Sequence, residues 1–334
     1  MTRSAPENGD VRSVLAHLVR SGGLDLAPPG RGDTPHRHRA LFDVARRWPV
    51  AVARCAEAHT DALAILAEAG RRPVGPGTLY GVWASGGDLS FDPASATVSG
   101  TKPFCSGLGI VDRALVTTDG GTGPLLLDLD VGPDRPGLRL DRSGWRTSTL
   151  AAARTGTVVF DRHPTGDGRP IGGPGWYLDR PGFWHGACGP AACWAGAAAG
   201  LVDVAEELID DDPHRRAHLG ALRAATWAAG AVLDAAGREI DRWPDDGEAA
   251  RYRALAARHV IERHCADILD RFGRALGPRP FVGMPETDQR FADTHLYLRQ
   301  DHAERDLHRL ADLPPTADRA GWGYRPATDA DPGR

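Results

Sequence analysis

The chain has 334 residues, of which 41% are hydrophobic and 25% are charged, as in ordinary globular proteins. This composition argues against a disordered, fibrous or membrane-spanning chain, and no run of about 18 apolar residues predicts a transmembrane helix. The formal net charge is −4 and basic residues form no long run, which argues against nucleic acid as the main partner. The length fits about two domains or one composite fold.

The first residues, MTRSAPENGDVRS, are polar and lack the apolar core of a secretion signal, so we expect a cytoplasmic protein. The five cysteines are odd in number and include no CxxC pair, which argues against disulfides and against a zinc site. His36 and His38 lie beside arginines, and we interpret them as a solvated basic turn. We therefore expect no metal. Lys102 is the only lysine in a chain whose other basic residues are arginine.

Residues 1–75 show helical patterns and predict a short N-terminal helical domain. Asp10 precedes an amphipathic run that Gly22 can end. Thr34 and Pro35 start a second helix, and Pro49 starts a third that extends to about Gly70.

Residues 76–163 have a different pattern, with short β-branched or apolar runs between Gly, Asp and Pro turns. The six runs are TLYGVWA, ATVSGTKPF, RALVTT, PLLLDLDV, LRLDRSGW and GTVVFDRH. They predict a domain of antiparallel strands, arranged as a sandwich or barrel.

Residues 164–313 begin with a loop rich in Gly, Pro and aromatic residues and then predict a bundle of four helices. The first helix opens at Gly189–Pro190, and its small residues permit close helix approach. The third is stopped by Gly277–Pro278, and the fourth runs continuously over 285–310. Residues 314–334 are rich in Pro, Gly, Asp and Arg and predict a loose tail.

Nucleotide-binding and hydrolase fingerprints are absent from the sequence. There is no GxGxxG between a strand and a helix, no GxxxxGK[ST] and no GxSxG. This disfavours a Rossmann dehydrogenase, a P-loop NTPase and an α/β-hydrolase.

The segment VSGTKPFCSG at 98–107 resembles the G-x-K-x-[WF]-x-[ST] signature of the acyl-CoA dehydrogenase family. Similar matches follow at 110–116, 144–148 and 157–160, so the resemblance covers about residues 35–312. It implies an α+β fold of acyl-CoA dehydrogenase type, with N-terminal helices, a middle antiparallel β-domain and a C-terminal four-helix bundle. The N-terminal domain is roughly 40 residues shorter than is usual in the family, which opens or rebuilds the acyl site.

The resemblance implies FAD bound against the β-domain. Phe104 matches the family's aromatic beside the flavin ring, Ser106 matches the hydroxyl at the ring's polar edge, and Cys105 lies between them. Trp83 stands where the family has the threonine of a Thr-Glu-Pro turn. The alternative for Trp83 and Phe104 is a pair of core aromatics.

The family's reaction needs a carboxylate with a raised pKa in a dry pocket. Counting from Asp293, the resemblance places Asp301 nearest the position of this base, with His302 as an alternative. The same segment also reads as a solvated charged helix face. Some members carry the base earlier, where His185 follows Phe183 and Trp184; a structural histidine is the alternative there.

The family's pyrophosphate-binding Arg-x-x-Phe-Gly is absent. Arg215 stands in its region and could pair with a phosphate, although three aspartates precede it at 210–212.

The resemblance implies α,β-dehydrogenation of an acyl thioester or related carbonyl compound. It also implies a homodimer or homotetramer, with the helix at 191–209 and its neighbours at the interface, and an electron-transfer flavoprotein as acceptor. Two alternatives stay open: a flavin-dependent monooxygenase on the same fold, and a non-catalytic partner subunit that has kept the fold.

Overall fold

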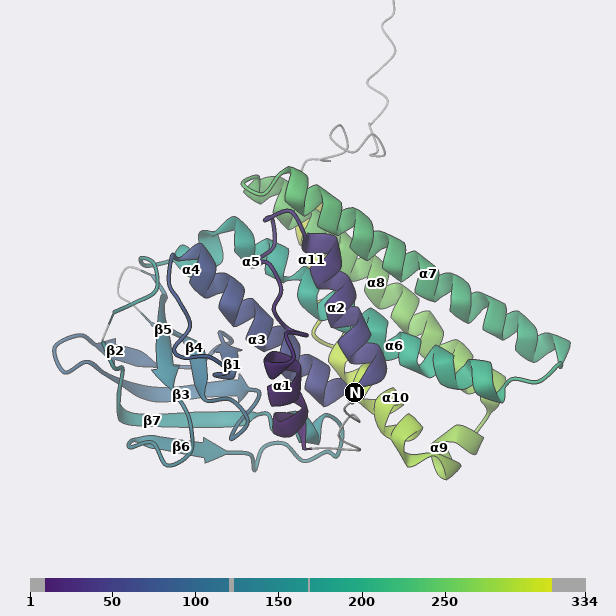
Figure 1. The fold of residues 1–334 in the computed structure, drawn as a ribbon, viewed down its shortest axis with the longest axis horizontal. Helices are drawn as coiled ribbons and strands as arrows, with labels where there is room; N and C mark the ends of the chain where they lie inside the picture. Colours follow the sequence, from purple (N-terminus) through teal and green to yellow (C-terminus); the bar gives the residue numbers. More distant parts are fainter. Residues whose placement is uncertain (1–9, 120–122, 168, 314–334) are drawn as a thin grey trace, which may run out of the picture.

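The computed structural model describes residues 10–119, 123–167 and 169–313, so the predicted tail at 314–334 lies outside the described residues. The N-terminal part forms the three expected helices: α1 (Val11–Arg20), α2 (Thr34–Arg47) and α3 (Val50–Glu68). One side of α3 packs on the β-domain, and its other side packs on α2 and the C-terminal helices. The helix α3 is therefore the element that separates the two halves of the molecule (Figure 1).

The β-domain contains the six expected strands and one that the sequence did not indicate, β2. The strands are β1 (Tyr80–Trp83), β2 (Ser90–Asp92), β3 (Thr97–Cys105), β4 (Arg113–Thr118), β5 (Leu125–Asp130), β6 (Leu138–Asp141) and β7 (Gly156–Pro164). They form a three-stranded sheet in the order β1-β4-β5 and a four-stranded sheet in the order β2-β3-β7-β6. A shared apolar core fills the space between the sheets.

One strand pair departs from the antiparallel expectation. Strands β1 and β4 are parallel, because β2 and β3 lie between them in the sequence and belong to the other sheet. The chain thus crosses over before it returns, which a parallel pair requires.

Short helices connect the β-domain to the C-terminal bundle, and the bundle itself follows the predicted order. The helices after β6 are η1 (Ala151–Ala153), α4 (Trp176–Asp179), α5 (Pro181–Gly186), α6 (Cys188–Leu208), α7 (Pro213–Arg242), α8 (Gly247–Leu276), α9 (Arg279–Gly283), α10 (Pro285–Leu298) and α11 (Glu304–Ala311). Gly277 follows α8 with φ +63°, in the position where the sequence predicted the stop.

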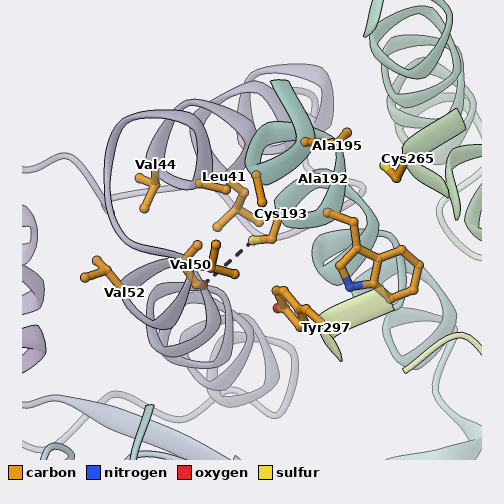
Figure 2. Close-up of a cluster of buried hydrophobic side chains, with 14 of the residues drawn as sticks. Leu41, Val44, Val50, Val52, Ala192, Cys193, Ala195, Cys265 and Tyr297 are labelled. Carbon is orange, nitrogen blue, oxygen red and sulfur yellow. Dashed lines mark hydrogen bonds between the residues drawn. The ribbon is translucent and has the colours of Figure 1, made fainter. Parts of the chain in front are cut away.

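Helix α6 lies at the centre of the bundle, surrounded by α2, α3, α7, α8 and α10. A Cβ at Gly196 would lie 2.1 Å from the carbonyl oxygen of Phe42, which confirms that small residues permit close helix approach. Figure 2 shows Cys193 of α6 pointing at α3, with Tyr297 of α10 beside it. Most of α6 is buried within one chain. That residues 191–209 and the neighbouring helices form a subunit interface stays a prediction.

One stretch, Pro181–Leu208, is long and apolar enough to cross a membrane when length and composition alone are considered. However, 78% of its most apolar window is buried inside the fold, and the central helix of a bundle has the same composition.

Two further expectations are corrected. The predicted fourth helix is interrupted between α10 and α11, where Ala303 has φ +46° and the Asp301 side chain accepts a hydrogen bond from the Ala303 amide at 3.1 Å. The interpretation of His36 and His38 as a basic turn is also wrong. Both lie on α2, and His38 is buried, with its Nδ1 2.9 Å from the carbonyl oxygen of Leu233.

Candidate functional site

A bulge in β3 places one large aromatic ring in solvent. The register between β3 and β7 shifts between Lys102 and Cys105, and Phe104 there adopts φ +56°. This is the left-handed region, which is costly for a bulky side chain. Phe104 is nevertheless 71% exposed, so neither burial nor backbone preference accounts for its presence. Strain of this kind concentrates at functional sites.

The lysine beside this bulge is buried and fully hydrogen-bonded. The Nζ of Lys102 donates to the Gly86 carbonyl at 2.7 Å, the Thr117 carbonyl at 2.8 Å and the Thr117 hydroxyl at 2.7 Å. Burial lowers the pKa of Lys102. An arginine has a rigid planar fork and cannot direct three donors from one atom. This geometry gives a physical reason for a lysine at this position.

The other residues assigned to the flavin site lie near Phe104 in the chain or contact its neighbour Ser106. The Ser106 hydroxyl lies 2.9 Å from the Thr155 hydroxyl. Trp83 is buried, and its indole N–H donates to the Ser106 carbonyl at 2.9 Å. Trp83 thus holds the backbone of Ser106 and does not contribute an exposed ring. The Cys105 side chain is also buried in the β-domain core, so only its backbone can face a ligand. We call Phe104, Ser106 and Thr155 the ledge.

The predicted base positions lie in the turn that breaks the fourth helix. Asp301 caps the Ala303 amide, and His302 Nδ1 lies 3.2 Å from a carboxylate oxygen of Asp306. Half of the His302 side chain is exposed. Arg258 of α8 ties this turn to the start of α6, donating to the Gln300 carbonyl at 2.8 Å and the Ala187 carbonyl at 2.9 Å. Neither Asp301 nor His302 shows the dry surroundings that the reaction requires of a base.

The segment from which we counted to Asp301 links three parts of the molecule. Arg290 of α10 donates to the carbonyl oxygens of Ala45 and Trp48, in α2 and the turn that follows it. One turn later, Asp293 accepts a hydrogen bond from the Leu150 amide at 2.6 Å. Burial raises the pKa of Asp293. Arg290 and Asp293 therefore have a structural role: they join α10 to the end of α2 and to the segment before η1.

Arg215 lies apart from the ledge. It lies in the first turn of α7, a helix that starts at the end of the bundle away from the sheets (Figure 1). Its guanidinium lies 3.1 Å from the Asp210 carboxylate. Asp212 caps the same helix through the amides of His214 and Arg215. Within one chain, therefore, Arg215 belongs to an exposed ion pair and not to the ledge.

The sequence analysis missed a row of charged residues on the inner side of α3. Arg54, Glu57 and Asp61 are spaced by three and four residues, so they share one helix face. The Arg54 guanidinium lies 3.3 Å from the Glu57 carboxylate and 6.0 Å from the centroid of the Tyr297 ring. Burial, opposed by Arg54 and reinforced by Asp61, raises the pKa of Glu57 to about 7. We call this row the charged face.

Glycines from α5 and α6 lie against the acidic side chains of α3. A Cβ at Gly186 would lie 2.6 Å from an Asp61 oxygen, and one at Gly189 would lie 3.2 Å from a Glu57 oxygen. The backbone of α5 and α6 therefore covers Glu57 and Asp61 of the charged face. The signal that could have revealed it is the triple of charged residues inside an otherwise apolar helix.

His185, the third candidate for proton transfer, lies in α5 and is buried. Its Nε2 lies 2.9 Å from the Pro244 carbonyl oxygen, and burial lowers the pKa of His185. It lines a small cavity together with Arg180 and Glu68, which form an ion pair. Neither Asp301 nor His302 lines this cavity.

No protein-family model matches the sequence, and no curated protein matches it. Solved structures do match in three dimensions. FMN-bound TdsC, a dibenzothiophene monooxygenase from Paenibacillus sp. A11-2, superposes with TM-score 0.71 at 15% identity over 90% of this chain and 94% of that one. KijD3 in complex with FMN and a dTDP-linked sugar gives 0.68 at 17%, over 93% and 90%. The methanesulfinate monooxygenase MsuC from Pseudomonas fluorescens gives 0.69 at 16%, over 95% and 96%. The chain has the acyl-CoA dehydrogenase-like fold that its sequence predicts.

Proposed function

We propose that this protein is a flavin-dependent monooxygenase that binds FMN at the ledge. The observation that carries the proposal is Phe104, an exposed ring held at positive φ beside the paired hydroxyls of Ser106 and Thr155. An isoalloxazine needs a flat apolar surface and hydrogen-bonding groups at its polar edge. The ledge fits both requirements. Bound flavin would supply the redox chemistry, and the chain's own residues would hold and orient it.

Two observations favour FMN over FAD. The arginine motif that would hold a pyrophosphate is absent, and Arg215 is paired with Asp210 far from the ledge. The similar structures of TdsC and KijD3 were solved with FMN. A mononucleotide needs no second phosphate site. Arg154 precedes Thr155 in the chain, and its guanidinium lies 3.5 Å from the exposed Asp10 carboxylate. It is the cation we assign to the phosphate, which would replace Asp10 as its partner.

The choice of a monooxygenase over a thioester dehydrogenase rests on the turn at 299–303. The carboxylate at the expected base position is engaged in capping Ala303. A monooxygenase needs no carboxylate there to remove an α-proton. The names of TdsC and MsuC describe oxygenation by proteins of this shape.

Acyl thioester dehydrogenation is the second candidate, and Glu57 favours it. A buried carboxyl group with a pKa raised to about 7 has the property required of an α-proton base. FAD and an electron-transfer flavoprotein would then be expected.

The test compares FMN and FAD binding to the purified protein, followed by flavin fluorescence. We expect FMN to bind, and Phe104→Ala to weaken its affinity about tenfold because ring stacking is lost. Oxygen consumption with reduced FMN would then support the monooxygenase, whereas oxidation of an acyl-CoA with an artificial acceptor would support the dehydrogenase. A protein that binds neither flavin would contradict both candidates and favour the non-catalytic partner subunit.

A further inference from the structure

A groove with a volume of about 560 Å³ lies between α2 and α7. Its lining residues recur mainly every three or four positions along each helix, so one continuous face of α2 and one of α7 form its walls. No residue of the ledge and none of the charged face belongs to the lining. The groove is therefore independent of the flavin proposal.

The α7 wall carries a large aromatic side chain that the fold leaves in solvent. Trp227 lines the groove and is 76% exposed, although burial of such a ring is strongly favourable. Gly230 follows three residues later on the same face, and a Cβ built there would meet nothing within 4 Å. The α2 wall contributes the half-buried Phe42. The groove thus offers an exposed indole, open space beside it and an apolar wall, which suits a flat aromatic ligand.

The groove also presents one uncompensated positive charge. Three of its charged lining residues form ion pairs: Arg46 with Asp203, Asp43 with Arg47, and Asp234 with Arg238. His38 is neutral near pH 7, because burial lowers its pKa to about 4. Arg39 is exposed, and no ion pair or hydrogen bond joins its side chain to residues 10–119, 123–167 or 169–313. A ligand with a single acidic group would compensate this charge.

One contact between the two helices sets the spacing of the ring and the charge. His38 Nδ1 lies 2.9 Å from the carbonyl oxygen of Leu233, so these two residues are at the same level of the groove. Arg39 directly follows His38, whereas Trp227 precedes Leu233 by six residues. At a rise of about 1.5 Å per residue, Trp227 and Arg39 are separated by about 9 Å along the groove.

A second copy of this chain suits the groove less well than a small acid does. In a two-fold dimer the same face meets itself, so Arg39 would need an unpaired carboxylate on that face. The two carboxylates of the lining, Asp43 and Asp234, are already in ion pairs. A dimer through this groove would therefore leave the charge of Arg39 uncompensated.

We propose that this groove is a binding site for a planar aromatic acid, whose ring stacks on Trp227 and whose carboxylate or sulfonate pairs with Arg39. A guanidinium can bind such a group through two parallel hydrogen bonds. A spacing of about 9 Å fits a fused two-ring system that carries one acid group. The volume lies within the range of sites for ligands of this size. No bond is made or broken on binding.

The test titrates naphthoate into the full-length protein and follows binding by calorimetry. We expect saturable binding of one molecule. Naphthamide, which has the same rings without the charge, should bind about fivefold more weakly. Cyclohexanecarboxylate, which has the charge without a flat ring, should bind about tenfold more weakly. Equal affinity for naphthoate and naphthamide, or a titration that never saturates, would overturn the proposal.

Matched variants locate the site. Trp227→Ala should weaken naphthoate about tenfold, and Gly230→Leu should abolish binding because the new side chain fills the open space. Gly220→Leu is the control: Gly220 also lies in α7 and a Cβ there also meets nothing within 4 Å, but it does not line the groove. Binding that survives Gly230→Leu, with an unchanged circular dichroism spectrum, would refute the site.

The charge has its own pair of variants. Arg39→Gln should remove the preference for naphthoate over naphthamide, whereas Arg20→Gln, at an exposed position of α1, should keep it. Sedimentation velocity tests the other occupant. Equal sedimentation of wild type and Trp227→Ala supports a small ligand. A dimer that dissociates in Trp227→Ala and that naphthoate leaves intact would show that a second copy covers the groove, and would overturn the proposal.

Discussion

The ledge on β3 and the charged face of α3 violate ordinary packing in opposite ways. The ledge exposes a large apolar ring on strained backbone, whereas the charged face buries Glu57 beside Arg54 and against glycine backbone. Phe104 and Ser106 of the ledge lie two residues apart in the chain, and Thr155 joins them from 49 residues after Ser106. The charged face exists only because α5 and α6, more than a hundred residues later, close over α3. Local sequence can therefore reveal Phe104, Ser106 and the charged triple of α3, but neither the Thr155 partner nor the glycines that cover the charged face.

The ledge depends on Lys102, so the largest expected effect comes from this residue. Lys102→Met leaves the carbonyls of Gly86 and Thr117 without their buried donor and should lower the free energy of unfolding by about 3–5 kcal/mol. Urea unfolding measures the change. Arg142→Met, at an exposed position of the same domain, should change it by less than about 0.5 kcal/mol. A small loss in Lys102→Met would show that the bulge holds without its lysine.

The charged face should appear in the pH dependence of stability. Below pH 4.5 Glu57 is protonated in both the folded and the unfolded chain, and between 4.5 and about 7 only the folded chain keeps the proton. Stability from this group therefore falls as pH rises through this window, by on the order of 3 kcal/mol. Glu57→Gln removes the titration, so the variant should gain stability relative to the wild type between pH 5 and 8.

Urea unfolding at several pH values checks this prediction, because the difference between the two proteins cancels the titration of other groups. Glu207→Gln, the same substitution at an exposed position of α6, serves as the control. Parallel stability curves for wild type and Glu57→Gln would mean that Glu57 has the same pKa in the folded and the unfolded chain, and would contradict the raised pKa.

The smallest expected effect separates the strain of the ledge from its ring. Phe104→Gly and Phe104→Ala both remove the ring, but only glycine adopts φ +56° without cost. Phe104→Gly should therefore be more stable than Phe104→Ala by about 1 kcal/mol, as measured by thermal unfolding. Equal stability of the two variants would mean that residue 104 does not adopt the left-handed backbone conformation.

The sequence predicted most of the fold because the elements follow from local patterns, and the family resemblance indicated Phe104 and Ser106 but not Thr155. Periodicity and turn residues located α1, α2, α3, six strands and the first three bundle helices. The break at Asp301–Ala303 was missed because the charged residues there have helical spacing, which predicts a continuous helix. In the structure the Asp301 side chain instead caps a turn. The parallel pairing of β1 and β4 depends on which sheet each strand joins, and the local sequence pattern of a strand does not predict its sheet. The cavity at Arg180 and His185 depends on four elements that only tertiary packing brings together.

The hydrogen bonds of Arg290 have a consequence for how the chain is made. They join α10 to carbonyls 242 and 245 residues earlier, in the part of the chain that leaves the ribosome first. At about 5–20 residues per second, α2 waits roughly 10–50 s for the arginine that secures its end. Until α6 and α7 emerge, the apolar sides of α2 and α3 have no bundle to cover them. Nascent chains of this protein should therefore depend on chaperones from early in translation until these helices emerge.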